Sequence, residues 1–571
     1  GPYEQNCLVN AMCLGIAPKE RLIRSAAAGV GNHLVLMGAR TGRDGIGGAS
    51  VLASAELGDD DADKRPTVQI GDPFEEKKVM EACLELLDRD LLASLQDLGA
   101  AGLSSSSSEM ASGGKVGLDI DVAKVPLREE GMEPFEIMVS ESQERMLAVV
   151  EPERLEEVRA VCERWEVRCT VIGAVTDTRR LRVFEGEELV GDMPVEALVD
   201  DCPLYDLAPQ RPEAQIYPAP PRVLEPSDDL ATNLLALLGC ANIASRRPLF
   251  EQYDAIVQSR TVRRPEVADA AVLALAHDTG GGPTAIAVAI DGNGRRVACD
   301  PYWGTAEAVL ECASNLACVG AEPLGLTNCL NFGNPERPHI AWQLTRSVEG
   351  MADALAALGV PVVGGNVSLY NQSGDGPIYP TPVVGMVGAL PDAAAAAEVG
   401  IAFRAGDTVA MVGTPDPSLA GSELAKLRGE ELPTELAEID IAAVGRTQEA
   451  VRDAVRAGEL RTAHDMAEGG LMTAIAECCL AGGVGATIEF PADAPPAYAD
   501  VERFLFGEGV GGFVVAGPRE AIDRLAERVP TDVLGVAGGD ELTVAAGGAS
   551  FGAVPLAAMR DANAALATAF A

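Results

Sequence analysis

Three acidic or amide side chains stand at the ends of apolar segments, just before glycine turns: Gln69, Asp97 and Glu141. A glycine turn lets main-chain N–H groups approach a phosphate, and a nearby carboxylate can hold the Mg²⁺ that accompanies it. Each position taken alone is equally consistent with a structural cap at a turn. The pattern therefore predicts a phosphate and magnesium site only if folding brings several of these turns together.

A longer glycine-rich stretch runs from Gly38 to Ala49 and contains Arg40 and Arg43. Two arginines beside a loop rich in backbone donors are typical of phosphate binding, and basic residues are scarce in this chain. The stretch lacks the lysine of a Walker motif, which excludes a P-loop NTPase.

The histidines do not indicate metal or nucleophilic chemistry. The four of them are far apart in sequence and form no H-x-x-x-H or His/Cys cluster. His464 stands beside Asp465 and could serve as a base, but the equivalent position in an internal repeat is Gln96. A structural role for His464 is the better interpretation.

That internal repeat organises the whole chain. Its pairs keep the same order and are separated by 375 (406−31), 368 (465−97) and 367 (508−141) residues: Gly31–Gly38 with Gly406–Gly413, Gln96–Leu103 with His464–Leu471, and Glu141 with Glu508. A slowly drifting offset indicates one duplicated domain with small deletions. When the offset of 375 is extended to the start of the chain, Gly1 aligns with Gly376. We therefore expect a block of about 150 residues to be missing ahead of Gly1.

Both copies close with the same order of elements. Arg145 to Val150 reads as a strand, Leu155 to Trp165 as an amphipathic helix and Cys169 to Val175 as another strand, and 513–537 repeats the order. Between the copies, Pro361 to Gly365 is expected to end in a glycine loop. Strands that alternate with helices predict α/β (α+β) domains with mixed sheets backed by helices.

The composition of the chain limits the classes of partner that the protein could bind. The formal charge is −42 and the pI about 4.4, spread along the whole length, so nucleic acid is excluded as a partner. Such a surface is typical of halophilic proteins, although an ordinary acidic cytosolic protein is also consistent with it. No apolar run approaches the roughly 18 residues of a membrane span, and the 13 cysteines include no C-x-x-C pair. We expect a cytoplasmic protein with free thiols and no membrane partner.

Six motifs together resemble the small form of phosphoribosylformylglycinamidine synthase, its synthetase subunit in purine biosynthesis. They are 39–49, 65–74, 96–103, 140–145, 330–336 and 364–371. The resemblance covers essentially the whole chain. It implies an ATP-dependent ligation in which an amide oxygen of formylglycinamide ribonucleotide is phosphorylated and ammonia then displaces the phosphate to give the amidine.

The fold that the resemblance implies is a duplicated pseudo-dimer of the aminoimidazole ribonucleotide synthase-like superfamily. Each half would have an ATP-binding-type domain followed by a C-terminal-type domain. We expect residues 1–15 to be the terminal strand of a missing first ATP-binding domain, 16–200 the first C-terminal-type domain, 201–228 a linker, 229–390 the second ATP-binding-type domain and 391–571 the second C-terminal-type domain.

The resemblance also implies roles for individual residues. The ribonucleotide would be contacted by Gln69, Glu141, Ser142, Gln143 and Ser368. Asp97 and Asn366 would hold Mg²⁺, and Asn328 and Gly365 would lie against ATP. Asn328 stands where the family commonly has Asp, which removes one negative charge but keeps hydrogen-bonding ability.

The family's catalytic histidines belong to the block that the repeat predicts to be missing, so no catalytic residue is identified and the chain alone is expected to be inactive. A separate glutaminase subunit and a small bridging subunit are the implied partners. A second hypothesis is a non-catalytic, nucleotide-binding scaffold of the same complex. A third keeps the superfamily and changes the substrate, as in aminoimidazole ribonucleotide synthase, selenophosphate synthetase or thiamine-monophosphate kinase, but those chains are typically single-copy.

The second copy has diverged at its own potential site. Asp465 and Glu508 are kept, but Ser142 and Gln143 correspond to Gly509 and Val510, and the loop 414–421 has no basic residue. A pocket without phosphate-pairing arginines should not bind a phosphorylated ribonucleotide. We therefore expect one productive site per chain, with the second site empty or holding a structural nucleotide whose metal Asp465 could keep.

Overall fold

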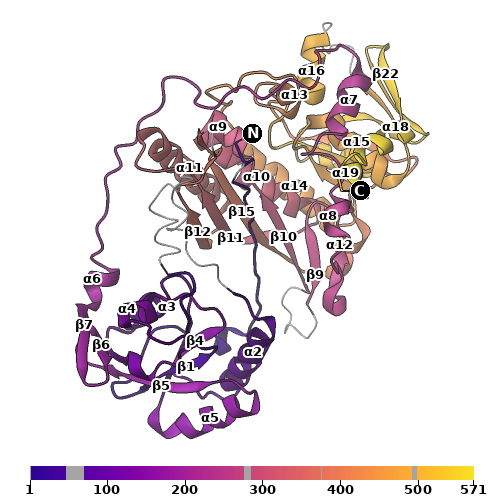
Figure 1. Cartoon of the computed structure of the whole chain (residues 1–571). Helices are drawn as coiled ribbons and strands as arrows, with labels where there is room; N and C mark the ends of the chain where they lie inside the picture. The colour runs from indigo at the N-terminus through magenta and orange to yellow at the C-terminus, as the bar shows by residue number, and fades with distance from the viewer. Residues whose placement is uncertain are drawn as a thin grey trace. The chain divides into compact units, whose positions relative to one another are not determined.

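The computed structural model describes residues 2–4, 6–46, 70–275, 284–373, 376–490 and 498–570. Gln69 and the last three residues of the glycine-rich stretch, 47–49, lie outside these ranges. The chain forms two compact units: Cys13–Asp206, here the small unit, and Gly1–Met12 with Leu207–Ala571, here the large unit. Each is described by itself below (Figure 1).

The small unit is built on one seven-stranded mixed sheet of order β2-β4-β1-β5-β3-β6-β7. Its strands are β1 (His33–Gly38), β2 (Ser94–Asp97), β3 (Gly117–Asp121), β4 (Arg145–Val150), β5 (Cys169–Thr176), β6 (Arg180–Glu185) and β7 (Glu188–Pro194). Its helices are α2 (Pro73–Asp88), α3 (Gly102–Gly114), α4 (Pro134–Val139), α5 (Leu155–Arg164) and α6 (Val195–Val199).

Alternation along the central strand β1 places a hydrophobic cluster on each face of this sheet. Leu34 and Leu36 lie in a cluster with residues of α3 and β3, while Val35 and Met37 lie in another with residues of α2 and α5. Successive side chains of a strand point to opposite faces, so four apolar residues in a row serve both clusters. Helices cover both faces for the same reason (Figure 1).

The large unit contains a six-stranded sheet of order β12-β11-β15-β10-β9-β8. Its strands are β8 (Thr261–Arg263), β9 (Ala271–Ala274), β10 (Ala285–Asp291), β11 (Glu322–Asn331), β12 (Val362–Ser368) and β15 (Thr381–Leu390). The associated helices are α9 (Gly294–Cys299), α10 (Pro301–Cys318), α11 (Pro338–Leu358) and α12 (Ala393–Glu398). The short strands β13 (Gln372–Ser373) and β14 (Gly376–Pro377) form a separate pair.

The large unit also contains a seven-stranded sheet of order β17-β19-β16-β20-β18-β21-β22. The strands are β16 (Thr408–Val412), β17 (Thr462–Asp465), β18 (Ala486–Phe490), β19 (Phe513–Gly517), β20 (Thr531–Ala537), β21 (Glu541–Ala546) and β22 (Ala549–Pro555). The remaining helices are α7 (Leu230–Leu238), α8 (Arg247–Phe250), α13 (Glu423–Leu427), α14 (Ile441–Arg456), α15 (Gly470–Gly482), α16 (Tyr498–Phe506), α17 (Arg519–Ala526), α18 (Leu556–Asn563) and α19 (Leu566–Ala569).

The two seven-stranded sheets have the same topology, strand for strand. In both, the only parallel pair among the described strands joins the third and sixth strands in sequence, β3 with β6 and β18 with β21. Both central strands also shift register at the same place, between Leu34 and Val35 and between Val409 and Ala410. The duplicated α/β fold predicted from the sequence repeat is confirmed.

Residues 6–15 join no sheet among the described residues, and Asn6 donates to the carbonyl oxygen of Gln372 at 3.3 Å. That residues 1–15 belong to a preceding domain stays a prediction. One local expectation was wrong. The glycines after Pro361 form no loop: β12 runs through them to Ser368. Pairing with β11 explains this, since Gly365 lies opposite Asn328 in the parallel register and its missing side chain leaves room for Asn328.

Within the described ranges, no helix combines the length and the apolar character that crossing a bilayer requires.

Candidate active site

Asp97 ends strand β2 and is exposed, directly before the turn that starts α3. The turn is tight: Ala101 is left-handed with φ of 57°, and a Cβ on Gly102 would lie 1.9 Å from the carbonyl oxygen of Ser140. Only glycine fits this approach. The turn thus brings Asp97 and the segment around Glu141 to the same end of the sheet.

Glu141 and Ser142 are buried and use their side chains inside the small unit. One Glu141 oxygen accepts a hydrogen bond from Ala101 N–H at 3.0 Å. The Ser142 hydroxyl accepts from Gly42 N–H at 2.9 Å and donates to Asp44. The main-chain N–H of Glu141 also donates to the carbonyl oxygen of Asp44, at 2.8 Å, so this segment is held firmly within the small unit.

Gln143 is half-buried and donates from Nε2 to the carbonyl oxygen of Glu141 at 2.9 Å. Behind it, the buried Arg145 donates to the carbonyl oxygens of Ser142 and Ser140 at 2.7 and 2.6 Å, and to Thr41 Oγ1 at 2.9 Å. Burial lowers the pKa of Arg145 to about 10, so it stays charged at neutral pH. Arg145 therefore fixes the shape of the loop between Ser140 and Gln143.

The glycine-rich stretch differs from its prediction. Arg43 is paired within the protein: it donates to Glu136 at 2.9 Å, to Glu129 at 3.3 Å and to the carbonyl oxygen of Gly131 at 2.7 Å. Arg40 is exposed and forms no ion pair with a described residue. A guanidinium held by two carboxylates is not available to a phosphate, so Arg43 positions a loop and Arg40 alone keeps the predicted role.

Sequence reasoning missed the ion pair beneath this loop. Arg128 donates to both oxygens of the buried Asp44, at 2.7 and 2.8 Å, and Asp44 is also the acceptor for Ser142. Asp44 and Arg128 are 84 residues apart, and no local pattern links them. Together they tie the glycine-rich stretch to the Glu141 segment.

Four further predicted residues lie on two adjacent strands of the large unit. Asn328 on β11 pairs with Gly365 on β12, and Ser368 on β12 pairs with Asn331. A Cβ on Gly365 would lie 2.4 Å from Asn328 Oδ1, so the Asn328 side chain lies directly against the Gly365 backbone. Asn366 is exposed and donates through Nδ2 to Cys329 Sγ at 3.6 Å, which leaves its amide oxygen for a ligand.

Ser368 is half-buried at the end of β12. Its hydroxyl accepts from Asn371 Nδ2 at 3.0 Å, and Asn371 also donates to the carbonyl oxygens of Ser368 and Phe332. This network fixes the end of the strand. The exposed strand β12 thus presents Gly365, Asn366 and Ser368 in a row.

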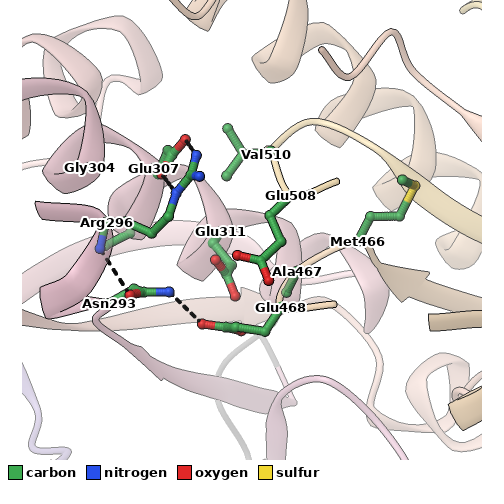
Figure 2. Close-up of a pocket in the computed structure, with 12 residues that line it drawn as sticks. Asn293, Arg296, Gly304, Glu307, Glu311, Met466, Ala467, Glu468, Glu508 and Val510 are labelled. Carbon is green, nitrogen blue, oxygen red and sulfur yellow. Dashed lines mark hydrogen bonds and ion pairs between the residues drawn. The ribbon is translucent and has the colours of Figure 1, made fainter. Parts of the chain in front are cut away.

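The site of the second copy is a cavity of about 80 Å³ that adjoins a smaller one. Both cavities are lined by Arg296, Glu307, Glu508, Gly509 and Val510. Figure 2 shows the carboxylates of Glu311, Glu468 and Glu508 pointing toward one space in the smaller cavity. The lining is therefore predominantly acidic.

Glu508 repeats the role of Glu141. It accepts from Gly469 N–H at 2.8 Å, the counterpart of Ala101 N–H, and from Glu423 N–H at 2.7 Å. Burial raises the pKa of Glu508 to about 7. Backbone donors that could bind an anion at the start of α13 and α15 are thus already occupied by a side chain of the protein.

Two arginines reach this site from α9, although the loop 414–421 itself has none. Arg295 pairs with Glu423 at 2.5 Å and donates to the carbonyl oxygen of Ser422 at 2.7 Å. Arg296 pairs with Glu307, with Nε to Oε2 at 2.8 Å (Figure 2). Both pairs are buried, so the arginines are neutralised inside the protein and not free for a phosphate.

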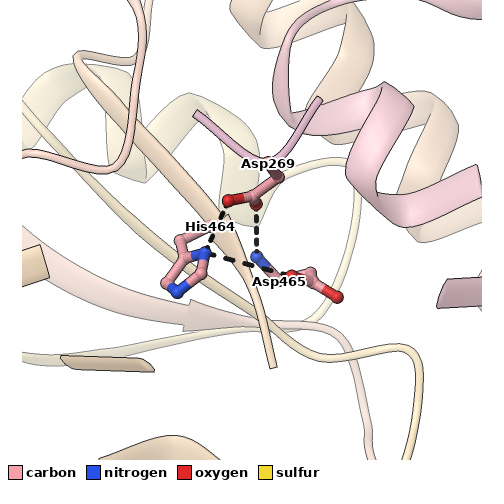
Figure 3. A group of neighbouring side chains, drawn as sticks. All are labelled: Asp269, His464 and Asp465. Carbon is pink, nitrogen blue, oxygen red and sulfur yellow. Dashed lines mark hydrogen bonds and ion pairs between the residues drawn. The ribbon is translucent and has the colours of Figure 1, made fainter. Parts of the chain in front are cut away.

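His464 lies in a group with Asp269 and Asp465 whose ligand atoms are within 4.8 Å of one another (Figure 3). Its Nδ1 is 2.7 Å from Asp269 and its Nε2 is 3.1 Å from Glu477. In the first copy, Gln96 and Glu109 stand at the positions equivalent to His464 and Glu477. Gln96 donates to Glu109 at 3.2 Å. A repeated hydrogen bond supports the structural interpretation of His464; Asp269, 195 residues away, was not foreseen.

Buried carboxyl groups around this cluster resist ionisation. Burial, then the charge of Glu468, raises the pKa of Asp291 to about 8. Burial and Asp269 raise the pKa of Asp465 well above its ordinary value. Burial alone would lower the pKa of His464, but Asp269 and Glu477 outweigh it and raise that pKa. The carboxyl groups of Asp291 and Asp465 in the second copy are thus buried and have raised pKa values, whereas Asp97, the counterpart of Asp465 in the first copy, is exposed.

The fold and the site together define the class of protein to which the chain belongs. The C-terminal domain of AIR synthase related proteins matches residues 29–186 and again 404–544, and the N-terminal domain matches 267–390. The first C-terminal match contains strands β1 to β6, and the second contains β16 to β20 and most of β21, so the two matches fall on the two seven-stranded sheets.

Curated relatives narrow the class to one family. The chain is 45% identical over 551 residues to phosphoribosylformylglycinamidine synthase subunit PurL of Moorella thermoacetica, covering 95% of this chain and 73% of that protein. It is also 45% identical to subunit PurL of Thermomicrobium roseum, covering 95% and 74%. The chain belongs to the PurL family of phosphoribosylformylglycinamidine synthase.

Solved structures agree. Thermotoga maritima PurL complexed with FGAR is 29% identical with a TM-score of 0.67, covering 91% of this chain and 74% of that one. T. maritima PurL complexed with ATP is 27% identical with a TM-score of 0.64, covering 91% and 73%. The structure of PurLQS from T. maritima is 28% identical with a TM-score of 0.64, covering 92% and 74%.

Proposed function

We propose that this chain takes part in the reaction of its family, the ATP-dependent conversion of formylglycinamide ribonucleotide and ammonia to formylglycinamidine ribonucleotide, ADP and phosphate. The observation that supports it most is 45% identity over 95% of the chain. Relatives of known structure have been captured with FGAR and with ATP. The alternative of a non-catalytic scaffold is not favoured.

We assign the ribonucleotide to the Glu141 segment. Glu141, Ser142 and Gln143 would contact it, and hydrogen bonds within the small unit hold the side chains of Glu141 and Ser142 in place. Ser368 and Gln69 complete the proposed set; Gln69 lies outside the described residues. The exposed Arg40 is the described cation of this region that remains for the phosphate.

We assign ATP to the β11–β12 pair. Gly365 has no side chain, so the Asn328 side chain lies directly against its backbone and both residues are held together on this strand pair. Asn328 can donate and accept hydrogen bonds, although it lacks the negative charge of the Asp usual in the family.

Mg²⁺ is the proposed metal, with Asp97 and Asn366 as ligands. Both are exposed and offer hard oxygen atoms, a carboxylate and an amide, which fit this ion. Bound Mg²⁺ would neutralise charge that develops on the transferred phosphoryl group. Asp97 contributes the negative charge, and Asn366 orients without adding a second one.

The partners and location follow from the family. The PurLQS structure of the relative supports assembly with further subunits, and we propose a glutaminase subunit and a small bridging subunit for this chain. We propose that the enzyme acts in the cytoplasm. We also propose the domain boundaries 16–200, 229–390 and 391–571, with 201–228 as linker and residues 1–15 belonging to a preceding domain.

A glycine pair tests the ATP assignment. In the enzyme that contains this chain, Gly365→Ala should raise KM for ATP at least about tenfold, because the new methyl group would collide with Asn328. Gly364→Ala is the matched control, since its Cβ would meet only Thr327 Oγ1 at 3.8 Å. Thermal unfolding of both variants separates misfolding from lost binding. Equal KM values for ATP in the two variants would contradict the assignment.

A further inference from the structure

A cavity of about 410 Å³ lies between helices α10, α11 and α14 of the large unit (Figure 1). Small apolar side chains form much of its wall, among them Ala313 and Ala317 of α10, Ala357 of α11 and Ala442 of α14. Alanines where three helices meet leave space that larger side chains would fill. The volume is within the range of roughly 300–1,000 Å³ that is typical of small-molecule sites.

This cavity is separate from the acidic site of the second copy. Gly304, Glu307 and Glu311 line the smaller acidic cavity, whereas Ala313 and Ala317 lie on the opposite face of the same helix, α10. The residues that line the two cavities have none in common, and none of those assigned to the ribonucleotide, ATP or Mg²⁺ lines the larger one. A ligand bound there would occupy an additional site.

Two arginines of α14 bring positive charge to this cavity. The side chain of Arg446 is exposed and forms no hydrogen bond or ion pair with a described residue. The side chain of Arg452 is 18% exposed, and its Nε is buried without a hydrogen-bond partner among the described residues. Glu449 at 3.8 Å and Asp453 at 3.7 Å are too far from Arg452 for hydrogen bonds. Both guanidinium groups therefore remain able to donate to a ligand.

Arginines with free donors stand out in a chain of formal charge −42. Arg295 and Arg296, at the site of the second copy, are each paired with a buried glutamate. At the larger cavity, Glu449 is the one carboxylate among the described lining residues, and its side chain is 64% exposed. The lining thus carries a net positive charge, which favours an anionic ligand.

We propose that this cavity binds an organic phosphate monoester, with the phosphate held by Arg446 and Arg452 and an apolar body packed against the alanines. Two guanidinium groups suit the dianion of a phosphate monoester better than a carboxylate, which carries a single charge. Six positions along a helix correspond to about 9 Å, a span that two arginine side chains can close around one phosphate. The proposal does not depend on the catalytic roles assigned above.

The wall of the cavity is fixed before a ligand binds. Gln448, which also lines it, donates from Nε2 to the carbonyl oxygen of Leu310 at 2.8 Å and to Ser314 Oγ at 3.0 Å. These buried hydrogen bonds hold α14 against α10. Binding therefore requires no rearrangement of the helices, which lowers its entropic cost.

The test is calorimetric titration of phenyl phosphate into the full 571-residue chain at low ionic strength. We expect one site that depends on Arg452, with higher affinity for phenyl phosphate than for inorganic phosphate, because the ring buries apolar area. Arg452→Met should weaken binding at this site at least about tenfold, because a charge-assisted contact is lost. Arg40→Met is the matched control: it removes an exposed, unpaired arginine from the small unit and should leave this site unchanged.

A second variant separates lost binding from misfolding. Ala357→Leu places extra apolar volume in the cavity at an exposed helix position, and leucine is a good helix former. It should weaken phenyl phosphate binding at least about tenfold and leave the midpoint of thermal unfolding unchanged.

Three outcomes would overturn the proposal. The first is the absence of any phenyl phosphate site that weakens in Arg452→Met and in Ala357→Leu. The second is a loss of affinity in Arg40→Met as large as in Arg452→Met, which would place the ligand in the small unit. The third is binding of inorganic phosphate or benzoate as tight as that of phenyl phosphate, because the apolar body or the phosphate would then contribute nothing.

Discussion

The two C-terminal-type domains have the same seven strands in the same order, yet their potential sites differ in what occupies them. In the first copy the carboxylate that ends its second strand, Asp97, is exposed. In the second copy the corresponding Asp465 is buried beside Asp269 and His464. The fold is thus the same in both copies, while the burial and the partners of the side chains at the two potential sites differ.

The comparison shows that the charged side chains around one copy of a potential site can pair with one another while the fold stays the same. Glu508 and Glu141 both accept hydrogen bonds at the start of equivalent helices, so this structural role is common to both copies. Around Glu508, however, α9 adds Arg295 and Arg296, and each is neutralised by its own glutamate. Charges that could have met a ligand are paired with one another.

The largest effect is expected from the two aspartates. In the enzyme that contains this chain, Asp97→Asn should lower turnover by roughly 10²–10³-fold with little change in ribonucleotide affinity, because the charge acts where phosphate is transferred. Asp465→Asn should leave turnover within about twofold, because Asp465 is buried beside Asp269 and His464 and is not among the residues assigned to the reaction. Steady-state kinetics with ammonium as nitrogen donor measure both. Equal losses in the two variants would make Asp97 structural.

The next effect concerns the buried ion pair of the second copy. Arg296→Met should destabilise the protein by about 3–5 kcal/mol, because Glu307 would remain buried without its partner. Arg346→Met is the control: its pair with Glu349 is exposed and should contribute less than about 1 kcal/mol. Denaturant unfolding of both variants gives the comparison. A loss below about 1 kcal/mol in Arg296→Met would show that the pair does not hold the second copy together.

A smaller effect separates the two glutamates. Glu141→Gln should lower turnover about tenfold or more, because its carboxylate shapes the segment that meets the ribonucleotide. Glu508→Gln should leave turnover and the midpoint of thermal unfolding nearly unchanged, because both backbone donors meet one oxygen of Glu508, Oε1, and the amide oxygen of Gln can accept both bonds. The same kinetic and melting measurements apply to each. Comparable turnover losses would mean that both copies catalyse.

The pH dependence should also set the second copy apart. Glu508 and Asp291 have folded-state pKa values raised to about 7 and about 8, above their unfolded values of 4.5 and 3.8. A raised pKa gives stability that is complete below the unfolded value and is lost as pH rises through the folded value. The free energy of unfolding of the large unit should therefore fall between about pH 5 and pH 8. Glu508→Gln should flatten this slope, and an unchanged slope would contradict the assignment.

The sequence predicted the fold where apolar periodicity and the repeat agreed. The strands before and after α5 begin at the predicted residues, Arg145 and Cys169, because their apolar runs have no competing explanation. The glycines of β12 misled the prediction, since glycine usually ends a strand and here allows Asn328 to approach. That approach depends on a partner strand, which a local pattern does not show.

The site was predictable in part for the same reason. Glu141, Ser142 and Gln143 could be proposed from sequence because they lie on one contiguous motif, and their role in the site stays a prediction. The pairing of Arg43 with Glu129 and Glu136, the link from Asp44 to Arg128 and the meeting of Asp269 with His464 join residues about 85 to 195 positions apart. Only folding brings them together, and they decide which charges remain free for a ligand.

The account's central claim is that one copy binds the ribonucleotide and the other is filled by its own side chains. Calorimetric titration of formylglycinamide ribonucleotide into the enzyme that contains this chain tests it most directly. We predict one site per chain, retained in Glu508→Gln and lost or strongly weakened in Glu141→Gln. Two equivalent sites per chain, or loss of the single site in Glu508→Gln, would contradict it.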